Sequence, residues 1–305
     1  HGLSEIFIGK ALKKYPSDSF HLTSKLPSWL IKSTEDAVRI FNEQLEKCQV
    51  EYFDYYLCHA LSKENFKPYL IPGVMDFLYQ MKKEGKIRHL GFSFHDSVEV
   101  LDEIIHTYEW DFVQLQLNYL DWSFIKAKEM YEIVESYGVP CIVMEPVRGG
   151  TLANLSEGAQ AIFKEANPNA SVASWAIRYA ASKPNVITVL SGMSNFEQTE
   201  DNIKTLSNFE LVTEKDQKVI DKALEVYLES ETIPCTSCNY CMPCPHGVEI
   251  PKNFTNYNKF AISKNKQGFV YEYEHNLEFS NADFCISCGE CVELCPQQIQ
   301  IPDRM

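Results

Sequence analysis

The chain contains no run of about eighteen apolar residues, so none of its segments could cross a membrane as a helix. Its first residues, HGLSEIFIGK, have no initiator methionine, no basic n-region and no apolar core. This excludes an intact signal peptide, and we expect the true start of the protein to lie upstream. Basic residues are scarce as well, with 28 Lys and Arg against 42 Asp and Glu and a formal net charge of −14. That balance argues against nucleic acid and anionic membranes and favours neutral, cationic or small partners.

The remaining composition is that of an ordinary globular protein. Hydrophobic residues make up 45% and charged residues 23% of the 305 positions, which disfavours intrinsic disorder. The length suits one large single-core domain together with something small. Cysteine is the exception, because eight of the eleven cysteines lie between Cys235 and Cys295.

Helical and β-rich segments alternate from the start of the chain to about residue 206. Amphipathic segments with a period near 3.6 predict helices at 4–15, 34–48, 72–84, 98–107, 124–137, 171–181 and 196–206. Short β-rich runs predict six strands, at 19–24, 53–58, 87–92, 112–117, 140–144 and 185–190. Alternation with such short connections implies parallel strands joined by right-handed crossovers.

Two α/β architectures fit this alternation, an open doubly wound sheet and a (β/α)8 TIM barrel. An open dinucleotide-binding sheet should carry a GxGxxG turn after its first strand, and the sequence has none. The strands end instead in polar or glycine-bearing tails, where a barrel places its catalytic loops. We therefore predict a TIM barrel. Because six strands do not close an eight-stranded barrel, we expect its first two βα units to be missing from this chain.

The barrel pattern ends with one further amphipathic segment, at 214–228. From Thr232 the chain becomes rich in Cys, Pro and polar residues. We therefore predict a barrel domain at 1–229 and a small cysteine-rich domain at 230–305. Within the small domain, 250–260 and 267–277 are predicted helices.

Two cysteine motifs give the small domain its chemistry. The first, CTSCNYCMPCP, contains Cys235, Cys238, Cys241 and Cys244, and the second, CISCGECVELCP, contains Cys285, Cys288, Cys291 and Cys295. The second has the C-x2-C-x2-C-x3-C-P spacing of bacterial ferredoxins, and the first differs by one residue in its last gap. By the ferredoxin rule, one [4Fe–4S] cluster takes Cys235, Cys238, Cys241 and Cys295. The other takes Cys285, Cys288, Cys291 and Cys244. With its two predicted helices between the motifs, this iron–sulfur domain resembles the α-helical ferredoxin domains of respiratory and archaeal reductases.

Two other interpretations of these cysteines are weaker. Adjacent C-x2-C pairs would be strained as disulfides, and the chain carries no secretion signal. Zinc sites use pairs of cysteines rather than triplets followed by Cys-Pro. The remaining cysteines, Cys48, Cys58 and Cys141, lie in apolar contexts and are predicted to be ordinary buried thiols.

Seven stretches of the N-terminal region carry a recognisable pattern: GLSEIFIGKALK, HLTSKLP, FDYYLCHAL, GKIRHLGFS, FVQLQLNYLD, VMEPVRGG and VLSGMSNFEQTEDNIKTL. In these stretches the region resembles the aldo-keto reductase family, in the branch that carries a C-terminal ferredoxin-type domain. They follow the family order across residues 2–206. The resemblance implies carbonyl reduction with NADPH by an Asp, Tyr, Lys, His tetrad at the mouth of the barrel.

The resemblance assigns two residues of this tetrad. Lys25 matches the lysine that lowers the pKa of the tyrosine, and His59 matches the histidine that orients the substrate carbonyl. An ammonium beside a phenol eases proton donation near neutral pH, and a histidine donor stabilises developing negative charge on oxygen. The family aspartate and tyrosine fall upstream of HGLSE and are not in this sequence.

The resemblance also assigns a nicotinamide site. Ser93 and Gln114 match positions that bond the carboxamide, and Arg148, Gly149 and Gly150 match the loop along the pyrophosphate. The adenosine-phosphate positions are matched by Gly192, Met193, Gln198 and Asn202. Met144 stands where many members stack an aromatic residue on the nicotinamide. The sequence shows no cationic clamp for a 2′-phosphate, so NADP(H) is implied by the family and NAD(H) stays open.

The leading hypothesis is an iron–sulfur aldo-keto reductase acting on a small carbonyl or alcohol in a reducing cytoplasm. Nicotinamides exchange two electrons and cubanes one, so coupling them normally needs a flavin or similar group. The clusters are then structural, or they deliver electrons to a different acceptor in the barrel mouth. A ferredoxin or a flavoprotein is the expected electron partner. The alternative is an electron-transfer protein whose barrel serves as a docking scaffold.

Overall fold

The computed structural model describes residues 3–230 and 232–305. The strands are β1 (Thr23–Pro27), β2 (Phe53–Leu61), β3 (Ile87–Phe94), β4 (Phe112–Gln116), β5 (Cys141–Met144) and β6 (Val186–Val189). The helices up to the predicted domain boundary are α1 (Ser4–Leu12), α2 (Thr34–Cys48), α3 (Val74–Lys83), α4 (Val98–Ile105), α5 (Asp121–Phe124), α6 (Ala127–Tyr137), α7 (Glu157–Ala166), α8 (Val172–Ala181), α9 (Phe196–Ser207) and α10 (Glu214–Leu228). Beyond it follow α11 (Ile250–Ser263), α12 (Lys266–Tyr271) and α13 (Glu290–Glu293).

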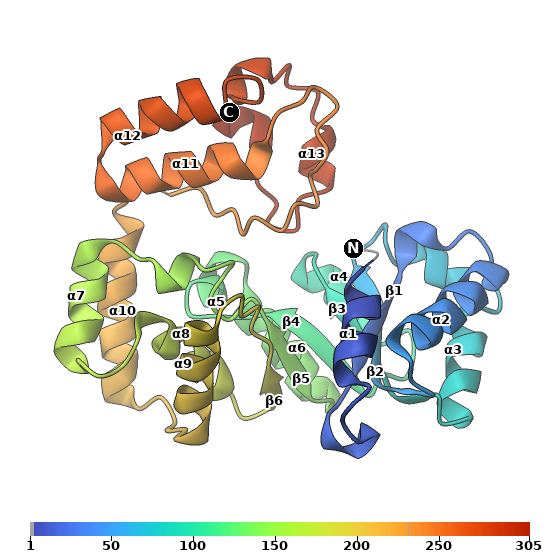
Figure 1. Cartoon of the computed structure of the whole chain (residues 1–305). Helices are drawn as coiled ribbons and strands as arrows, with labels where there is room; N and C mark the ends of the chain where they lie inside the picture. The colour runs from blue at the N-terminus through green and yellow to red at the C-terminus, as the bar shows by residue number, and fades with distance from the viewer. Residues whose placement is uncertain (1–2, 231) are drawn as a thin grey trace. The chain divides into compact units, whose positions relative to one another are not determined.

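The six strands form one sheet in the order β1 to β6, which is also their order in the chain (Figure 1). The pairs β1/β2, β2/β3 and β3/β4 are parallel, as the alternation of elements predicts. In the β1/β2 register, Lys25 lies beside Leu57 and Pro27 beside His59. The carboxyl ends of parallel strands share one edge of the sheet. The residues that follow each strand therefore lie along that edge.

Most predicted elements lie within a few residues of the observed ones, and the larger differences are as follows. The predicted helix at 124–137 is divided into α5 and α6, and Lys126 between them takes a left-handed conformation with φ of 56°. Helix α13 was not predicted. Strand β1 starts at Thr23 rather than residue 19, because Ser17–Ser19 form a 3-10 turn in which the Ser19 hydroxyl donates to the Pro16 carbonyl at 2.7 Å. Helix α7 was not predicted, and its buried residues are Ala159 and Phe163. The predicted helix at 267–277 becomes α12 followed by a π-turn over Glu272–Asn276.

The first of two compact units contains most of the sheet. It runs to Gln116 and adds Lys126–Val143 and Asn185–Thr188. Strand β2 is buried along nearly its whole length, as expected for a parallel strand covered on both faces. The ring of Phe41 in α2 packs edge-on against Phe53 and Tyr56 of β2, with centroids 5.9 and 5.0 Å apart.

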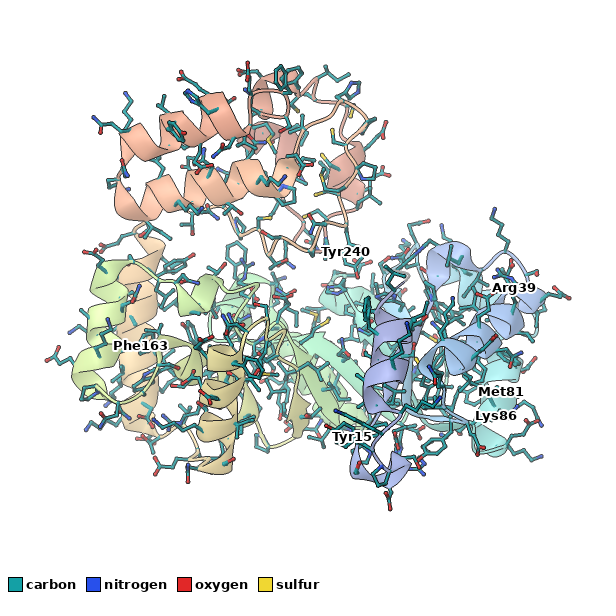
Figure 2. The ribbon with its side chains drawn as sticks, in the orientation of Figure 1. Tyr15, Arg39, Met81, Lys86, Phe163 and Tyr240 are labelled. Atoms are coloured by element: carbon teal, nitrogen blue, oxygen red, sulfur yellow. The ribbon has the colours of Figure 1, made fainter. Side chains whose placement is uncertain are left out.

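The second compact unit contains Leu117–Ile125, Met144–Pro184 and Val189–Met305. Phe163 of α7, labelled in Figure 2, packs on Trp175 of α8 with ring centroids 4.9 Å apart. In the segment after α10, an apolar cluster of six buried residues packs against the cysteines: Ile233, Val248, Ile250, Phe254, Ile299 and Ile301. The boundary at 229/230 stays a prediction. Within the described residues, no helix combines the length and apolar character needed to span a bilayer.

Candidate functional sites

Lys25 and His59 lie on neighbouring strands of the first unit and are both half-buried. Burial lowers the pKa of Lys25 to about 8. The pKa of His59 falls to about 3, because of burial first and then the positive charges of Lys25 and His95. These mutual effects place the three side chains in one electrostatic environment. His59 is therefore a neutral imidazole at physiological pH, able to donate one hydrogen bond.

A bulge in β2 presents His59 to this environment. The pairing of β2 with β3 shifts register between Cys58 and Leu61, and Ala60 takes a left-handed conformation with φ of 52°. A bulge of this kind redirects the neighbouring side chain and is common beside functional sites. The strain at a non-glycine residue requires support from the surrounding structure.

Three side chains supply that support by bonding the backbone of the bulge. The Tyr69 hydroxyl accepts a hydrogen bond from the His59 amide at 2.8 Å and donates to the Leu26 carbonyl. The Ser93 hydroxyl accepts from the Ala60 amide at 2.8 Å. The Asn65 side-chain amide donates to the Ala60 carbonyl at 3.0 Å. The backbone of the bulge is thus held by Ser93 of β3 and by two residues of the segment between β2 and α3, Asn65 and Tyr69.

Ser93 and Gln114, predicted to bond a carboxamide, are brought side by side. They are partners in the β3/β4 register, and both are at most 2% exposed. The Ser93 oxygen is already an acceptor for Ala60, but a hydroxyl also has a donor hydrogen that a ligand carbonyl could receive. Their cofactor role stays a prediction.

His95 belongs with these residues, although the sequence analysis did not select it. It follows β3 directly, is half-buried, and its pKa is lowered to about 4 by burial and by the charge of Lys25. Its backbone amide donates to the Leu61 carbonyl at 2.9 Å, next to the bulge. The available signal was a polar residue at the carboxyl end of a predicted strand, in FSFHD.

In the second unit, the structure places Arg148 among protein atoms. Its side chain is 1% exposed, and Nε donates to Oδ1 of Asp121 at 2.8 Å. Nη1 donates to the carbonyl of Pro234 at 2.9 Å, and Nη2 donates to the side-chain oxygen of Gln297 at 3.1 Å. Pro234 precedes Cys235, and Gln297 follows Cys295 and Pro296. The predicted pyrophosphate role of Arg148 is untested, but its guanidinium has three protein partners.

Gly149 and Gly150 follow with positive φ angles of 60° and 91°. The Gly149 amide donates to the Glu145 carboxylate, and a Cβ built on Gly149 would collide with the carbonyl of Thr236. Burial raises the pKa of Glu145. The loop after β5 therefore packs closely on the first cysteine motif, and glycine is needed at 149 because a side chain does not fit.

The predicted adenosine-phosphate residues lie around the start of α9. The Asn195 side chain caps this helix by accepting from the Gln198 amide at 2.9 Å, and Asn202 donates to the Ser191 hydroxyl at 2.9 Å. Met193 is 44% exposed, and a Cβ on Gly192 would meet no atom within 4 Å. An exposed helix N-terminus of this kind suits a phosphate, and the assignment remains a prediction.

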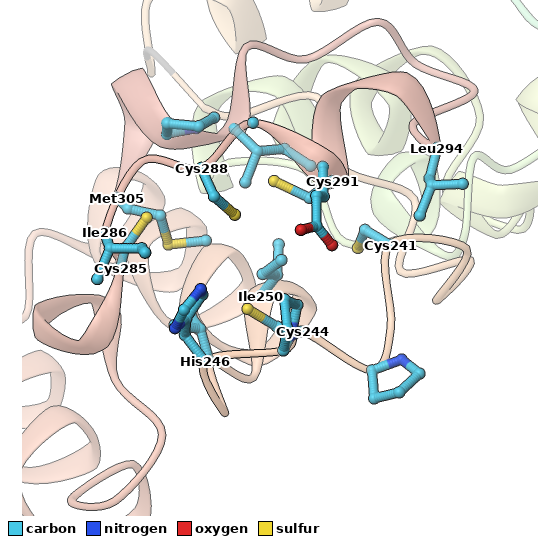
Figure 3. Close-up of a pocket in the computed structure, with 17 residues that line it drawn as sticks. Cys241, Cys244, His246, Ile250, Cys285, Ile286, Cys288, Cys291, Leu294 and Met305 are labelled. Carbon is cyan, nitrogen blue, oxygen red and sulfur yellow. The ribbon is translucent and has the colours of Figure 1, made fainter.

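The eight cysteines of the two motifs line two cavities of the small domain. One cavity is lined by Cys235, Cys238, Cys241 and Cys295. The other is lined by Cys244, Cys285, Cys288 and Cys291 and also by Cys241, as Figure 3 shows, so Cys241 lines both cavities. With Cys241 counted in the first group, each group of four combines three cysteines of one motif with the last cysteine of the other, which is the ligand exchange of a two-cluster ferredoxin.

The thiol electrostatics divide the cysteines in the same way. Burial first, then the charges of Cys238, Cys235 and Cys295, raises the pKa of Cys241 to about 12. Burial first, then Cys285, Cys288 and Cys244, raises the pKa of Cys291. Four such thiols can become thiolates together only when a cationic core neutralises them, so the donor set fits an iron–sulfur cluster. All eleven cysteines are free thiols.

The two motifs share one backbone conformation. Ser237 and Ser287 occupy the same place between the first two cysteines of each motif and have φ angles of 56° and 58°. Asn239 and Gly289, which follow the second cysteines, have φ angles of 64° and 84°. Left-handed residues in such loops turn backbone amides inward and form anion-binding concavities, which are known at iron–sulfur sites. Among the described residues, no three His, Cys, Asp or Glu side chains converge on a single ion position.

Comparison with known proteins identifies both parts of the chain. Residues 1–225 match the aldo/keto reductase family, and residues 234–299 match a 4Fe-4S dicluster domain. The first match spans more than half of the sequence, so the chain belongs to the aldo/keto reductase family. The second favours iron–sulfur clusters over zinc or disulfides. The predicted family and the predicted combination of domains are confirmed.

Individual relatives agree with this assignment. The L-galactose dehydrogenase of Arabidopsis thaliana is 22% identical over 228 residues, covering 68% of this chain and 71% of that protein. The aldo-keto reductase AKR11C1 of Bacillus halodurans in its holo form has a TM-score of 0.59 and 22% identity, covering 72% of this chain and 77% of its own. An aldo-keto reductase of Klebsiella pneumoniae solved with NADPH has a TM-score of 0.58 and 19% identity, covering 73% and 75%. These structures confirm the predicted barrel-type fold.

Proposed function

We propose that the protein is an iron–sulfur aldo-keto reductase that transfers hydride between a nicotinamide cofactor and a small carbonyl or alcohol. One observation carries the proposal. Lys25 and His59 lie half-buried on the adjacent strands β1 and β2, where the charge of Lys25 acts on His59. The family assignment supports the oxidoreductase class. A relative named for the dehydrogenation of L-galactose makes sugar-like alcohols and aldehydes the first substrates to test.

Two residues of the chain suit stabilisation of the negative charge that develops on the substrate oxygen. His59 is neutral because its pKa is about 3, so its N–H can donate to a substrate oxygen as negative charge develops there. Lys25, with a pKa of about 8, still carries most of its charge at pH 7 and favours an anion nearby. A bound nicotinamide would supply the hydride. Ser93 and Gln114 are proposed to hold its carboxamide.

We further propose two [4Fe–4S] clusters with the ligand sets that line the two cavities. The first set is Cys235, Cys238, Cys241 and Cys295, and the second is Cys244, Cys285, Cys288 and Cys291. Thiolate ligands need a reducing compartment, so we place the protein in the cytoplasm. Single-electron exchange with a ferredoxin or flavoprotein partner is the role such clusters would support.

An anaerobic turnover assay tests the enzyme proposal. Purified protein with its clusters is mixed with NADPH or NADH and a panel of small aldehydes, ketones and sugars, and oxidation is followed at the nicotinamide absorbance. We expect oxidation that depends on the carbonyl compound, together with saturable cofactor binding. Absence of cofactor binding for both NADPH and NADH would refute the proposal.

One observation favours the second candidate, an electron-transfer protein whose barrel is a docking scaffold. Arg148 and Gly149, the residues that should accompany the pyrophosphate, contact the cysteine-bearing segments instead. In that case a reduced ferredoxin should reduce the clusters while no nicotinamide binds. Isothermal titration with NADPH and NADH, beside stopped-flow reduction of the clusters, separates the two candidates.

A further inference from the structure

The buried guanidinium of Arg148 joins the two chain segments that carry ligands of one proposed cluster. Its bond to the Pro234 carbonyl, at 2.9 Å, is made one residue before Cys235. Its bond to Gln297, at 3.1 Å, is made two residues after Cys295. These segments lie 86 and 149 positions away from Arg148 along the chain, so the contact depends on the folded structure alone.

The loop that carries Arg148 contacts the lining of the same cavity at a second point. Thr236 and Gln297 both line the cavity of Cys235, Cys238, Cys241 and Cys295. Gly149 packs against the carbonyl of Thr236, while Arg148 bonds Gln297. Neither Thr236 nor Gln297 lines the other cavity, whose ligand Cys288 is exposed. The contact thus distinguishes the two cavities.

A buried guanidinium requires a fixed negative partner, and Asp121 supplies it. Asp121 is 0% exposed and lies 2.8 Å from the Arg148 Nε. It also accepts a hydrogen bond from the Asn118 side chain at 2.6 Å, and Asn118 donates to the Glu145 carbonyl at 2.9 Å. The guanidinium is therefore anchored to the loops after β4 and β5, with Nη1 and Nη2 directed toward the cysteine segments.

We propose that Arg148 is a positioning residue that ties the cluster of Cys235, Cys238, Cys241 and Cys295 to the barrel domain and raises its reduction potential. The inference rests on the ligand sets proposed above. The step concerned is the gain of one electron, from a formal [4Fe–4S]2+ core to a [4Fe–4S]+ core. With four thiolates the cluster carries about −2 before that step, and a nearby cation stabilises the more negative reduced form.

The Arg148/Asp121 pair gives a test with two opposite signs. The holoprotein and its Arg148→Gln and Asp121→Asn variants are titrated anaerobically, with the reduced clusters followed by electron paramagnetic resonance. Removing the cation should lower the potential of one cluster, and removing the anion should raise the potential of that same cluster. The other potential should not move. Cys235→Ser and Cys285→Ser identify which signal belongs to which ligand set.

Arg178→Gln is the matched control, because Arg178 also pairs with an aspartate, Asp216, but bonds the carbonyls of Glu210 and Leu211 in the barrel domain. We expect no change in either potential. Arg148→Lys keeps the charge but loses the forked geometry, so it should keep most of the potential and lose cluster iron on storage. If Arg148→Gln fails to fold, the rise expected in Asp121→Asn still tests the inference.

Several results would overturn the inference. They are a shift of the same sign in Arg148→Gln and Asp121→Asn, equal shifts of both clusters, or a shift in the Cys285 set alone. Iron analysis distinguishes failure of the proposed role of Arg148 from failure of the proposed cluster assignment. A wild-type protein with far fewer than about eight irons per chain contradicts the proposed clusters themselves. A full iron content with unmoved potentials contradicts only the role of Arg148.

Discussion

The cysteine motifs and the Lys25/His59 environment are specified in opposite ways. In the motifs, spacing and a repeated left-handed backbone at Ser237 and Ser287 position the proposed ligands, so most of the information is local. Lys25 and His59 are far apart in the chain and share one electrostatic environment because β1 pairs with β2 in one register. Binding of the proposed clusters should therefore tolerate changes elsewhere in the fold. The environment of Lys25 and His59 should instead depend on the β1/β2 register and on the bulge in β2.

The largest effect should come from removing one ligand. In Cys291→Ser, the harder hydroxyl is a poor iron ligand, so we expect one cluster to be lost or unstable. Iron should fall from about eight toward about four per chain, with loss of roughly half the charge-transfer absorbance. Cys48→Ala removes a buried thiol of α2 outside the motifs and should keep full iron. Unchanged iron in Cys291→Ser would contradict the second ligand set.

The next largest effect should be on carbonyl reduction and not on the proposed clusters. Lys25→Met removes the only charge proposed to favour an anion beside His59, and we expect carbonyl reduction to fall by at least about 100-fold. The iron content and the spectrum of the clusters should not change, because the motifs are specified locally. Lys83→Met, on an exposed face of α3, is the control and should keep normal turnover. Normal turnover in Lys25→Met would reject the assignment of Lys25.

Features that local sequence specifies could be predicted, and features that depend on long-range contacts could not. Helix α2 was predicted with its observed bounds, because the apolar period is strong and the Ser33 hydroxyl caps it by accepting from the Asp36 amide. Pairing of the last cysteine of each motif with the other group also follows from spacing. Three features depend on long-range contacts that no local pattern encodes. They are the position of His95 near Lys25, the support of the bulge by Tyr69 and the partners of Arg148. Strand β1 was misplaced because a local polar turn competed with it.

A smaller effect is the shift in the pKa of Lys25, which reports on the environment of Lys25 and His59 directly. The pKa of Lys25 should be about 8, against about 10.4 for an ordinary lysine. The folded state binds the proton less tightly than the unfolded state, so this group makes folding more favourable as pH rises from about 8 toward 10. The measurement is a titration of 13C-dimethylated lysines by NMR, with Lys25→Arg to assign the signal. A titration midpoint near 10.4 would show that Lys25 is solvated.

The smallest predicted effect concerns the bulge that presents His59. Tyr69→Phe removes the hydroxyl that accepts from the His59 amide and donates to the Leu26 carbonyl. Because the first of these hydrogen bonds is partly buried and the second is buried, we expect unfolding to become easier by about 1–3 kcal/mol, measured as an anaerobic urea transition. Tyr15→Phe, on a side chain that is 53% exposed, should change the transition by less than about 0.5 kcal/mol. If His59 depends on this support, Tyr69→Phe should also reduce turnover while full iron is retained. Reduced stability with normal turnover would instead show that the bulge positions His59 without help from Tyr69.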